Sequence, residues 1–145
     1  MKAFSFRLEQ ALRWRGTQVA AQQSRVAAAA AQRSAVEMLL TSAKAEAAGG
    51  AAAIIDMVRE PASFPLLSYA AFVDRSRARI RQLEVNLAAA ERALGAERDL
   101  LVAANQKLRL LENFKHDAQQ RWRGEFDREL STFADEAFLG ASRAR

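Results

Sequence analysis

The sequence predicts an all-α fold in which two long helices form an antiparallel coiled-coil hairpin over residues 1–145, as one domain. Alanine, leucine, arginine, glutamate and glutamine dominate the 145 residues, and these are strong helix formers. Apolar residues recur in steps of three and four along both halves of the chain. The only two prolines, Pro61 and Pro65, lie between the halves. The second helix is expected to project beyond the first.

The first helix is expected over about residues 4–58. Its stripe of inward-facing positions, the seam, follows steps of four and three: Leu8, Leu12, Arg15, Val19, Gln22, Val26, Ala29, Arg33, Val36, Leu40 and Ala43. A repeat of about 3.5 residues keeps one stripe of a supercoiled helix against its partner. The regular spacing therefore predicts a helix that pairs in a coiled coil rather than an isolated helix.

The second helix is expected over about residues 66–138, and its repeat is more apolar. Its seam positions are Val73, Ser76, Ile80, Leu83, Leu87, Ala90, Leu94, Glu97, Leu101, Ala104, Leu108, Leu111, Lys115, Ala118 and Trp122. The stripe continues through Phe126, Leu130 and Phe133, but the step from Trp122 to Phe126 is four where three is due. Such an insertion predicts a locally unwound coil after Trp122.

The chain is expected to reverse at about residues 59–66, because a proline disfavours helix at the residue before it. A short connection between long helices favours antiparallel neighbours. A turn centred on residues 61–64 places residue i opposite residue 125 − i, within about four positions. Phe4 and Phe6 then lie against Ala118 and Trp122.

Five polar residues interrupt the predicted seam: Arg15, Gln22, Arg33, Glu97 and Lys115. Polar seam residues commonly fix the register of a coiled coil, while long side chains extend outward to water. This interpretation is favoured. A coil weakened so that its two helices separate on binding is the alternative.

The residue types exclude several kinds of chemistry. The chain has no cysteine, so it has neither disulfides nor thiol chemistry. The single histidine, His116, has Glu112 one turn earlier, and two ligands make an incomplete metal site. No phosphate-binding loop or nucleophile motif is present. The sequence predicts a protein that is not an enzyme and holds no metal or cofactor.

The charge pattern bears on partners. The net charge of +5 comes from 22 basic and 17 acidic residues spread along the chain, which is typical of solvated helix faces. A nucleic-acid interface concentrates basic residues on one face. No apolar stretch approaches the roughly 20 residues of a membrane span. We therefore expect no nucleic-acid partner and no direct membrane insertion.

Tyr69 and Phe72 follow the prolines, where the hairpin tip is expected. An exposed aromatic pair on a polar rod suits docking, and packing of the coil end accounts for the same residues equally well. Both interpretations stay open.

Three motifs together resemble the flagellar export protein FliJ family over the whole chain. The opening Phe4-Ser-Phe6-Arg-Leu8, with Leu12 after it, resembles the family's start. Tyr69-x-x-Phe72 after a proline-containing turn resembles the beginning of its second long helix. Asp135-Glu136 is similar to the acidic pair that ends its C-terminal arm. This arm is more apolar than the family's usual arm, which is more densely charged.

The resemblance implies a cytoplasmic component of the flagellar type III export apparatus, peripherally associated with the inner membrane through the export gate. Such a stalk promotes assembly of the export ATPase ring and links it to the gate's cytoplasmic domain and to export chaperones. The gate-facing residues would be Tyr69 and Phe72. The ATPase-facing residues would be Phe4, Phe6, Leu8, Leu12, Asp135 and Glu136. In isolation the chain is expected to be a monomer.

Three other functions fit the sequence. The equivalent stalk of an injectisome shares the shape and role, and a motility defect would separate the two. A structural coiled-coil scaffold would form a parallel dimer. A basic nucleic-acid binder would show salt-dependent retention of DNA or RNA.

Overall fold

The computed structural model describes residues 3–57 and 66–143 and contains two long helices in this part of the chain. These are α1 (Glu9–Met57) and α2 (Leu66–Arg143), and they pack against each other. The all-helical fold class predicted from the sequence is confirmed. Pro61, Pro65 and the predicted turn before Leu66 lie outside the described residues.

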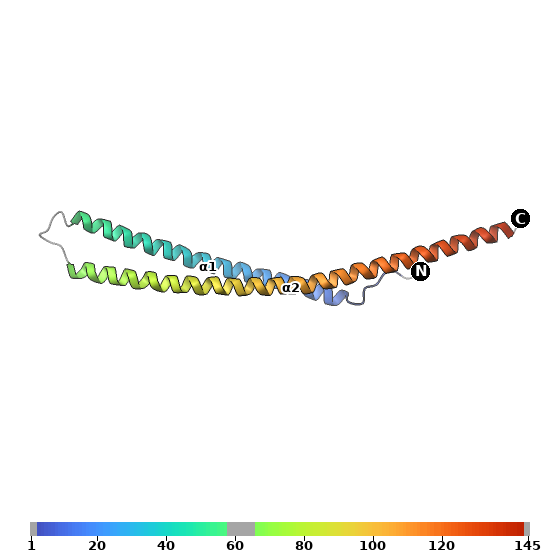
Figure 1. Cartoon of the computed structure of the whole chain (residues 1–145), viewed down its shortest axis with the longest axis horizontal. Helices are drawn as coiled ribbons and strands as arrows, with labels where there is room; N and C mark the ends of the chain where they lie inside the picture. The colour runs from blue at the N-terminus through green and yellow to red at the C-terminus, as the bar shows by residue number, and fades with distance from the viewer. Residues whose placement is uncertain (1–2, 58–65, 144–145) are drawn as a thin grey trace. The chain divides into compact units, whose positions relative to one another are not determined.

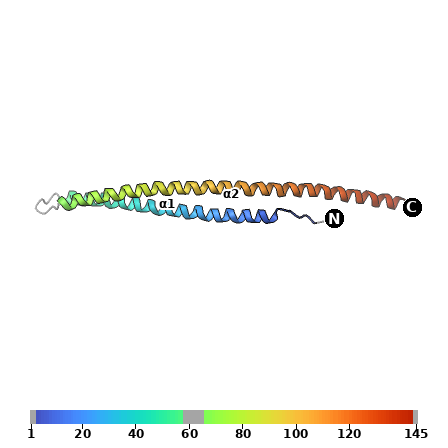
Figure 2. The same cartoon turned by 90° about the horizontal axis from the view of Figure 1, so that it is seen from below.

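The structure divides into two compact units, each of which contains part of both helices. The central unit comprises Gln22–Leu101, and the terminal unit combines Met1–Ala21 with Val102–Arg145. In the central unit α1 and α2 lie side by side and run in opposite directions (Figure 1; Figure 2). In the terminal unit the start of the chain lies along α2, since Phe4 contacts Trp122 and Glu9 contacts Lys115.

The core is a thin seam, as the shortage of large apolar side chains predicts. In the central unit Leu40, Ala43 and Leu94 are buried, and in the terminal unit Val19 is buried. Every other predicted seam residue up to Trp122 is half-buried except Gln22, which is also buried, and Leu8, which is exposed. The 3.5-residue repeat therefore located the contact face of both helices.

Ion pairs and ring contacts fix the register within each unit. In the central unit, Lys44 pairs with Glu84 at 3.1 Å and Glu46 with Arg79 at 3.0 Å. In the terminal unit, Glu9 pairs with Lys115 at 2.7 Å. All three pairs agree with residue i lying opposite residue 125 − i within four positions. Gln22 departs from this register. The register places Gln22 opposite residue 103, whereas its side chain contacts Glu97.

The start of α1 and the end of α2 differ from the predicted ones, whereas the end of α1 and the start of α2 agree within one residue. α1 begins at Glu9 rather than at about residue 4, and residues 3–6 are not helical. The Phe6 carbonyl accepts a bond from the Glu9 amide at 3.1 Å, which turns the chain into the helix. Glu9 then lies in the first turn, where its negative charge interacts favourably with the positive end of the helix dipole. α2 continues past residue 138 to Arg143, so Gly140 does not end it.

Candidate docking surfaces

The polar seam residues have partners, and the contacts of Gln22, Arg33 and Lys115 with the opposite helix support the register interpretation. The Gln22 side chain is buried, and its Nε2 donates to the Glu97 carbonyl oxygen at 3.0 Å and also to the Glu97 carboxylate. The Arg15 guanidinium lies 4.7 Å from the centre of the Trp14 ring. Lys115 pairs with Glu9.

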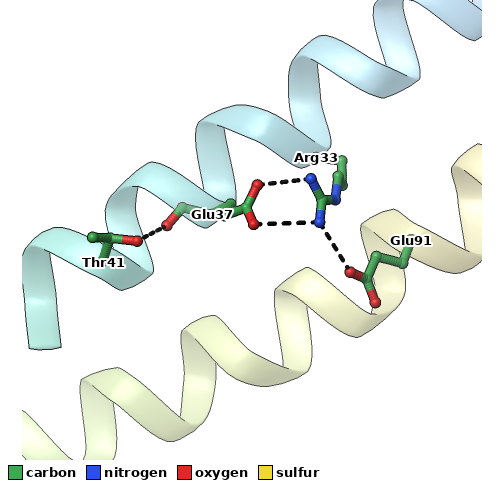
Figure 3. Close-up of polar contacts among 4 residues, drawn as sticks. All are labelled: Arg33, Glu37, Thr41 and Glu91. Atoms are coloured by element: carbon green, nitrogen blue, oxygen red, sulfur yellow. Dashed lines mark hydrogen bonds and ion pairs between the residues drawn. The ribbon is translucent and has the colours of Figure 1, made fainter.

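Arg33 forms the most connected of these contacts. Its Nη1 lies 2.7 Å from the Glu37 carboxylate on the same helix, and its Nη2 lies 3.5 Å from Glu91 on α2 (Figure 3). The Thr41 hydroxyl donates to the Glu37 carbonyl oxygen at 2.9 Å. Because these groups are partly exposed, the ion pairs add little stability, and only the pair between Arg33 and Glu91 crosses the seam and bears on register.

Tyr69 and Phe72, the predicted gate-facing residues, lie in the first turns of α2 and are both half-buried. The Phe72 ring packs over the α1 backbone at Gly50. A Cβ placed on Gly50 would lie 2.5 Å from Phe72 Cε1, so only glycine leaves room for the ring in this position. Phe72 therefore packs against α1 and keeps part of its surface accessible.

The predicted ATPase-facing residues near the start of the chain pack in the terminal unit. Phe4, Phe6 and Leu12 are half-buried, and Leu8 is 44% exposed. The Phe4 ring lies 6.0 Å from that of Trp122, which in turn lies 5.3 Å from Phe126. The aromatic cluster expected between Phe4 and Trp122 is present. Leu8 contributes little to the seam, because it precedes the helix.

Asp135 and Glu136 do not belong to that cluster. They lie on α2 more than ten residues beyond Trp122, which is roughly 20 Å along a helix. Both are exposed. The predicted ATPase-facing residues thus occupy two places, the cluster around Trp122 and the last turns of α2.

The last part of α2 carries exposed apolar side chains. We call residues 123–139 the arm. Leu130 is 50% exposed, Phe133 69% and Phe138 76%, and Leu139 is also exposed. Phe126, next to Trp122, is half-buried. In the terminal unit the described start of the chain contacts α2 at Trp122, and the exposed apolar side chains of the arm lie beyond that contact.

The terminal unit carries further exposed apolar side chains that were not predicted from the sequence. Trp14, Leu110 and Phe114 are each more than half exposed. Leu110 and Phe114 each precede a seam residue, Leu111 and Lys115, by one position, so they have the same four-residue spacing as the seam. This spacing is the sequence feature from which the exposed pair could have been predicted.

The central unit holds a shallow groove of about 410 Å³. It is lined by Ala29, Gln32, Val36, Asn86, Ala89, Ala90 and Ala93. Alanine side chains leave this space because they are too short to fill the angle between two helices. No polar atom of a buried side chain lacks a partner within the described residues.

The titratable side chains do not assemble a metal site within residues 3–57 and 66–143. No three of His, Cys, Asp and Glu come together there, and His116 with Glu112 stays an isolated pair. In the same ranges, neither helix has a stretch apolar and long enough to cross a membrane.

Comparison of the chain with protein-family models, with characterised proteins and with solved structures finds no match.

Proposed function

We propose that this chain is a non-enzymatic docking protein of a flagellar type III export apparatus. In this proposal the terminal unit binds the export ATPase ring and promotes its assembly. The end of the central unit that carries Tyr69 and Phe72 binds the cytoplasmic domain of the export gate. Export chaperones are further partners, and the protein is held at the inner membrane through the gate.

The uncovered arm is the observation that carries the proposal. Leu130 and Phe133 continue the seam stripe beyond Trp122, and they are exposed where the seam residues before them are covered. An amphipathic helix with a free apolar face binds by placing that face in a partner's groove. A hairpin with such an arm suits a stalk that inserts into a ring.

Two further features support a binding role. The seam is held by buried apolar side chains such as Leu40 and Leu94 and by paired polar groups, which suits a stable scaffold. The exposed apolar side chains, in contrast, include large ones that a protein without partners would hide. The resemblance of the three motifs to the FliJ family supplies the identity of the partners.

The test is co-purification with the export ATPase and with the gate domain, together with the ATPase rate. We expect the chain to bind both and to raise the ATPase rate. The double variant Leu130→Ser and Phe133→Ser should weaken ATPase binding at least tenfold. Burial of each apolar side chain in the complex would contribute roughly 1.5–3 kcal/mol to the binding free energy. Gate binding and helicity should be unchanged.

The matched control is Met38→Ser with Leu39→Ser. These side chains are 70% and 50% exposed in the central unit, so the control removes similar exposed apolar surface away from the arm. An arm variant that binds the ATPase as tightly as the control does would contradict the proposal. Binding to an injectisome ATPase in place of the flagellar one would assign the chain to that system.

A further inference from the structure

The arm presents one narrow apolar stripe that continues the seam. On a helix with about 100° per residue, Phe126, Leu130, Phe133 and Ala137 fall within roughly 60° of one another. Phe138 and Leu139 face other directions. The four stripe residues follow Trp122, the seam residue that Phe4 contacts. The stripe is thus an extension of an existing helix–helix interface, with one of the two helices absent.

Acidic side chains line both edges of this stripe. On the same helical projection, Glu129 and Glu136 border one edge, with Glu125 just outside them, and Asp127 borders the other. Arg123 is the only basic residue of the arm near an edge, at its beginning. Arg128 points away from the stripe, as does Asp135. The surface around the exposed apolar residues is therefore negatively charged.

These acids differ from the acids beside the seam of the hairpin. Glu9, Glu37, Glu46, Glu84 and Glu91 each pair with a lysine or arginine. None of the four edge acids of the arm forms an ion pair within the part of the chain that the structure describes. Five acids beside the seam of the hairpin are thus matched by basic partners, Glu112 beside Leu111 is not, and none of the four edge acids of the arm is, within the described residues.

The same charges disfavour pairing between the arms of two copies. In an antiparallel pair, the edge with Glu125, Glu129 and Glu136 would face its own copy. In a parallel pair it would face the edge with Asp127. Either arrangement places carboxylates against carboxylates, which destabilises a coiled coil. A second copy of this chain is therefore a poor occupant of the stripe.

We infer that the arm binds a basic amphipathic helix of a partner protein, with apolar side chains against the stripe and lysine or arginine along both edges. Charge complementarity selects this occupant, and continuity with the seam selects its helical form. The inference names the chemistry of the partner in the proposed function. It rests on that proposal only for the identity of the partner. It states the chemistry that the ATPase side of the interface must provide.

The experiment uses the full chain and two fluorescein-labelled peptides of the arm sequence, residues 121–139. The first peptide has the natural sequence. The second, the lysine peptide, carries Glu125→Lys, Asp127→Lys, Glu129→Lys and Glu136→Lys. Both keep the stripe residues, so they differ only in edge charge. Binding is followed by fluorescence anisotropy at about 50 and 300 mM salt, which brackets a Debye length near 10 Å.

We expect the lysine peptide to bind at least tenfold more tightly than the natural peptide, with the difference shrinking at the higher salt concentration. Leu130→Ser with Phe133→Ser in the full chain should abolish this binding, and Met38→Ser with Leu39→Ser should not. General attraction cannot account for the result, because the whole chain carries a net charge of +5 and repels a basic peptide.

Three results would overturn the inference: no binding of the lysine peptide, equal binding of the two peptides, or binding that survives the arm substitutions. Since no ATPase is present, these results are independent of the co-purification experiment. Peptide binding without ATPase binding would keep the inferred surface and reject the proposed partner.

Discussion

Gly50 shows how one residue sets the contact between the two helices in the central unit. Glycine weakens a helix interior by about 0.5–1 kcal/mol relative to alanine, and here it makes room for the Phe72 ring. The neighbouring Gly49 faces open space. The Gly49-Gly50 pair is visible in the sequence, but the sequence alone does not reveal which of the two touches the opposite helix.

The two glycines give a matched pair of substitutions. Gly49→Ala should stabilise the protein by about 0.5–1 kcal/mol through helix propensity alone. Gly50→Ala gains the same propensity but displaces the Phe72 ring, so its net effect should be zero or destabilising. Urea denaturation measures both. Equal stabilisation by the two substitutions would show that Phe72 does not pack on Gly50.

The contact between Gln22 and Glu97 was only partly predictable from the sequence. Their seam positions follow from the heptad repeat, so their inward direction was predictable. Their mutual contact was not, since the general register places Gln22 opposite residue 103. A buried amide needs a hydrogen-bond acceptor, and the Glu97 carbonyl and carboxylate supply two. The Gln22 side chain reaches along the seam to Glu97 and meets that requirement there.

At the scale of the elements, the start of the chain departs most from the sequence prediction. Helix formers and the apolar repeat predicted a helix from about residue 4, whereas α1 begins at Glu9. The non-helical residues 3–6 include Phe4, whose ring lies 6.0 Å from Trp122. Burial of an aromatic ring outweighs the small helix propensity of a few residues, and local sequence does not report that contact.

Trp122 should therefore hold the N-terminal segment on α2. We expect Trp122→Ala to remove the ring contacts with Phe4 and Phe126 and so to release residues 3–8 from the surface of α2. Trypsin should then cleave after Arg7 at least several-fold faster, because aromatic pairs contribute about 0.5–1.5 kcal/mol beyond their buried area.

Trp14→Ala is the control for this substitution, because Trp14 is 53% exposed and lies on another face of the terminal unit. Its effect on cleavage after Arg7 should be small. If the two tryptophan substitutions accelerate cleavage equally, the N-terminal segment is not held by the aromatic cluster.

At the scale of the whole chain, the sequence predicted the antiparallel arrangement and most of the register. The reason is the double constraint of the fold: each helix carries a 3.5-residue stripe, and the prolines limit where the chain can reverse. The candidate surfaces were less predictable. Exposed apolar faces such as Leu110 and Phe114 use the same residue types as the seam, so composition does not separate a core face from a docking face.

The central claim is that one chain folds back on itself, so that each helix meets the other helix of the same molecule. Two ion pairs from separate units test it: Glu9 with Lys115 at 2.7 Å, and Glu84 with Lys44 at 3.1 Å. A carbodiimide joins a carboxylate to an amine only at such contact distances. Equal amounts of ¹⁴N- and ¹⁵N-labelled protein would be mixed, refolded together and cross-linked before peptide mass spectrometry.

We predict both cross-links, each joining peptides of the same isotope, because both partners belong to one chain. Cross-links that join ¹⁴N to ¹⁵N peptides in statistical proportion would contradict the account, since they would show that the helices pair between molecules.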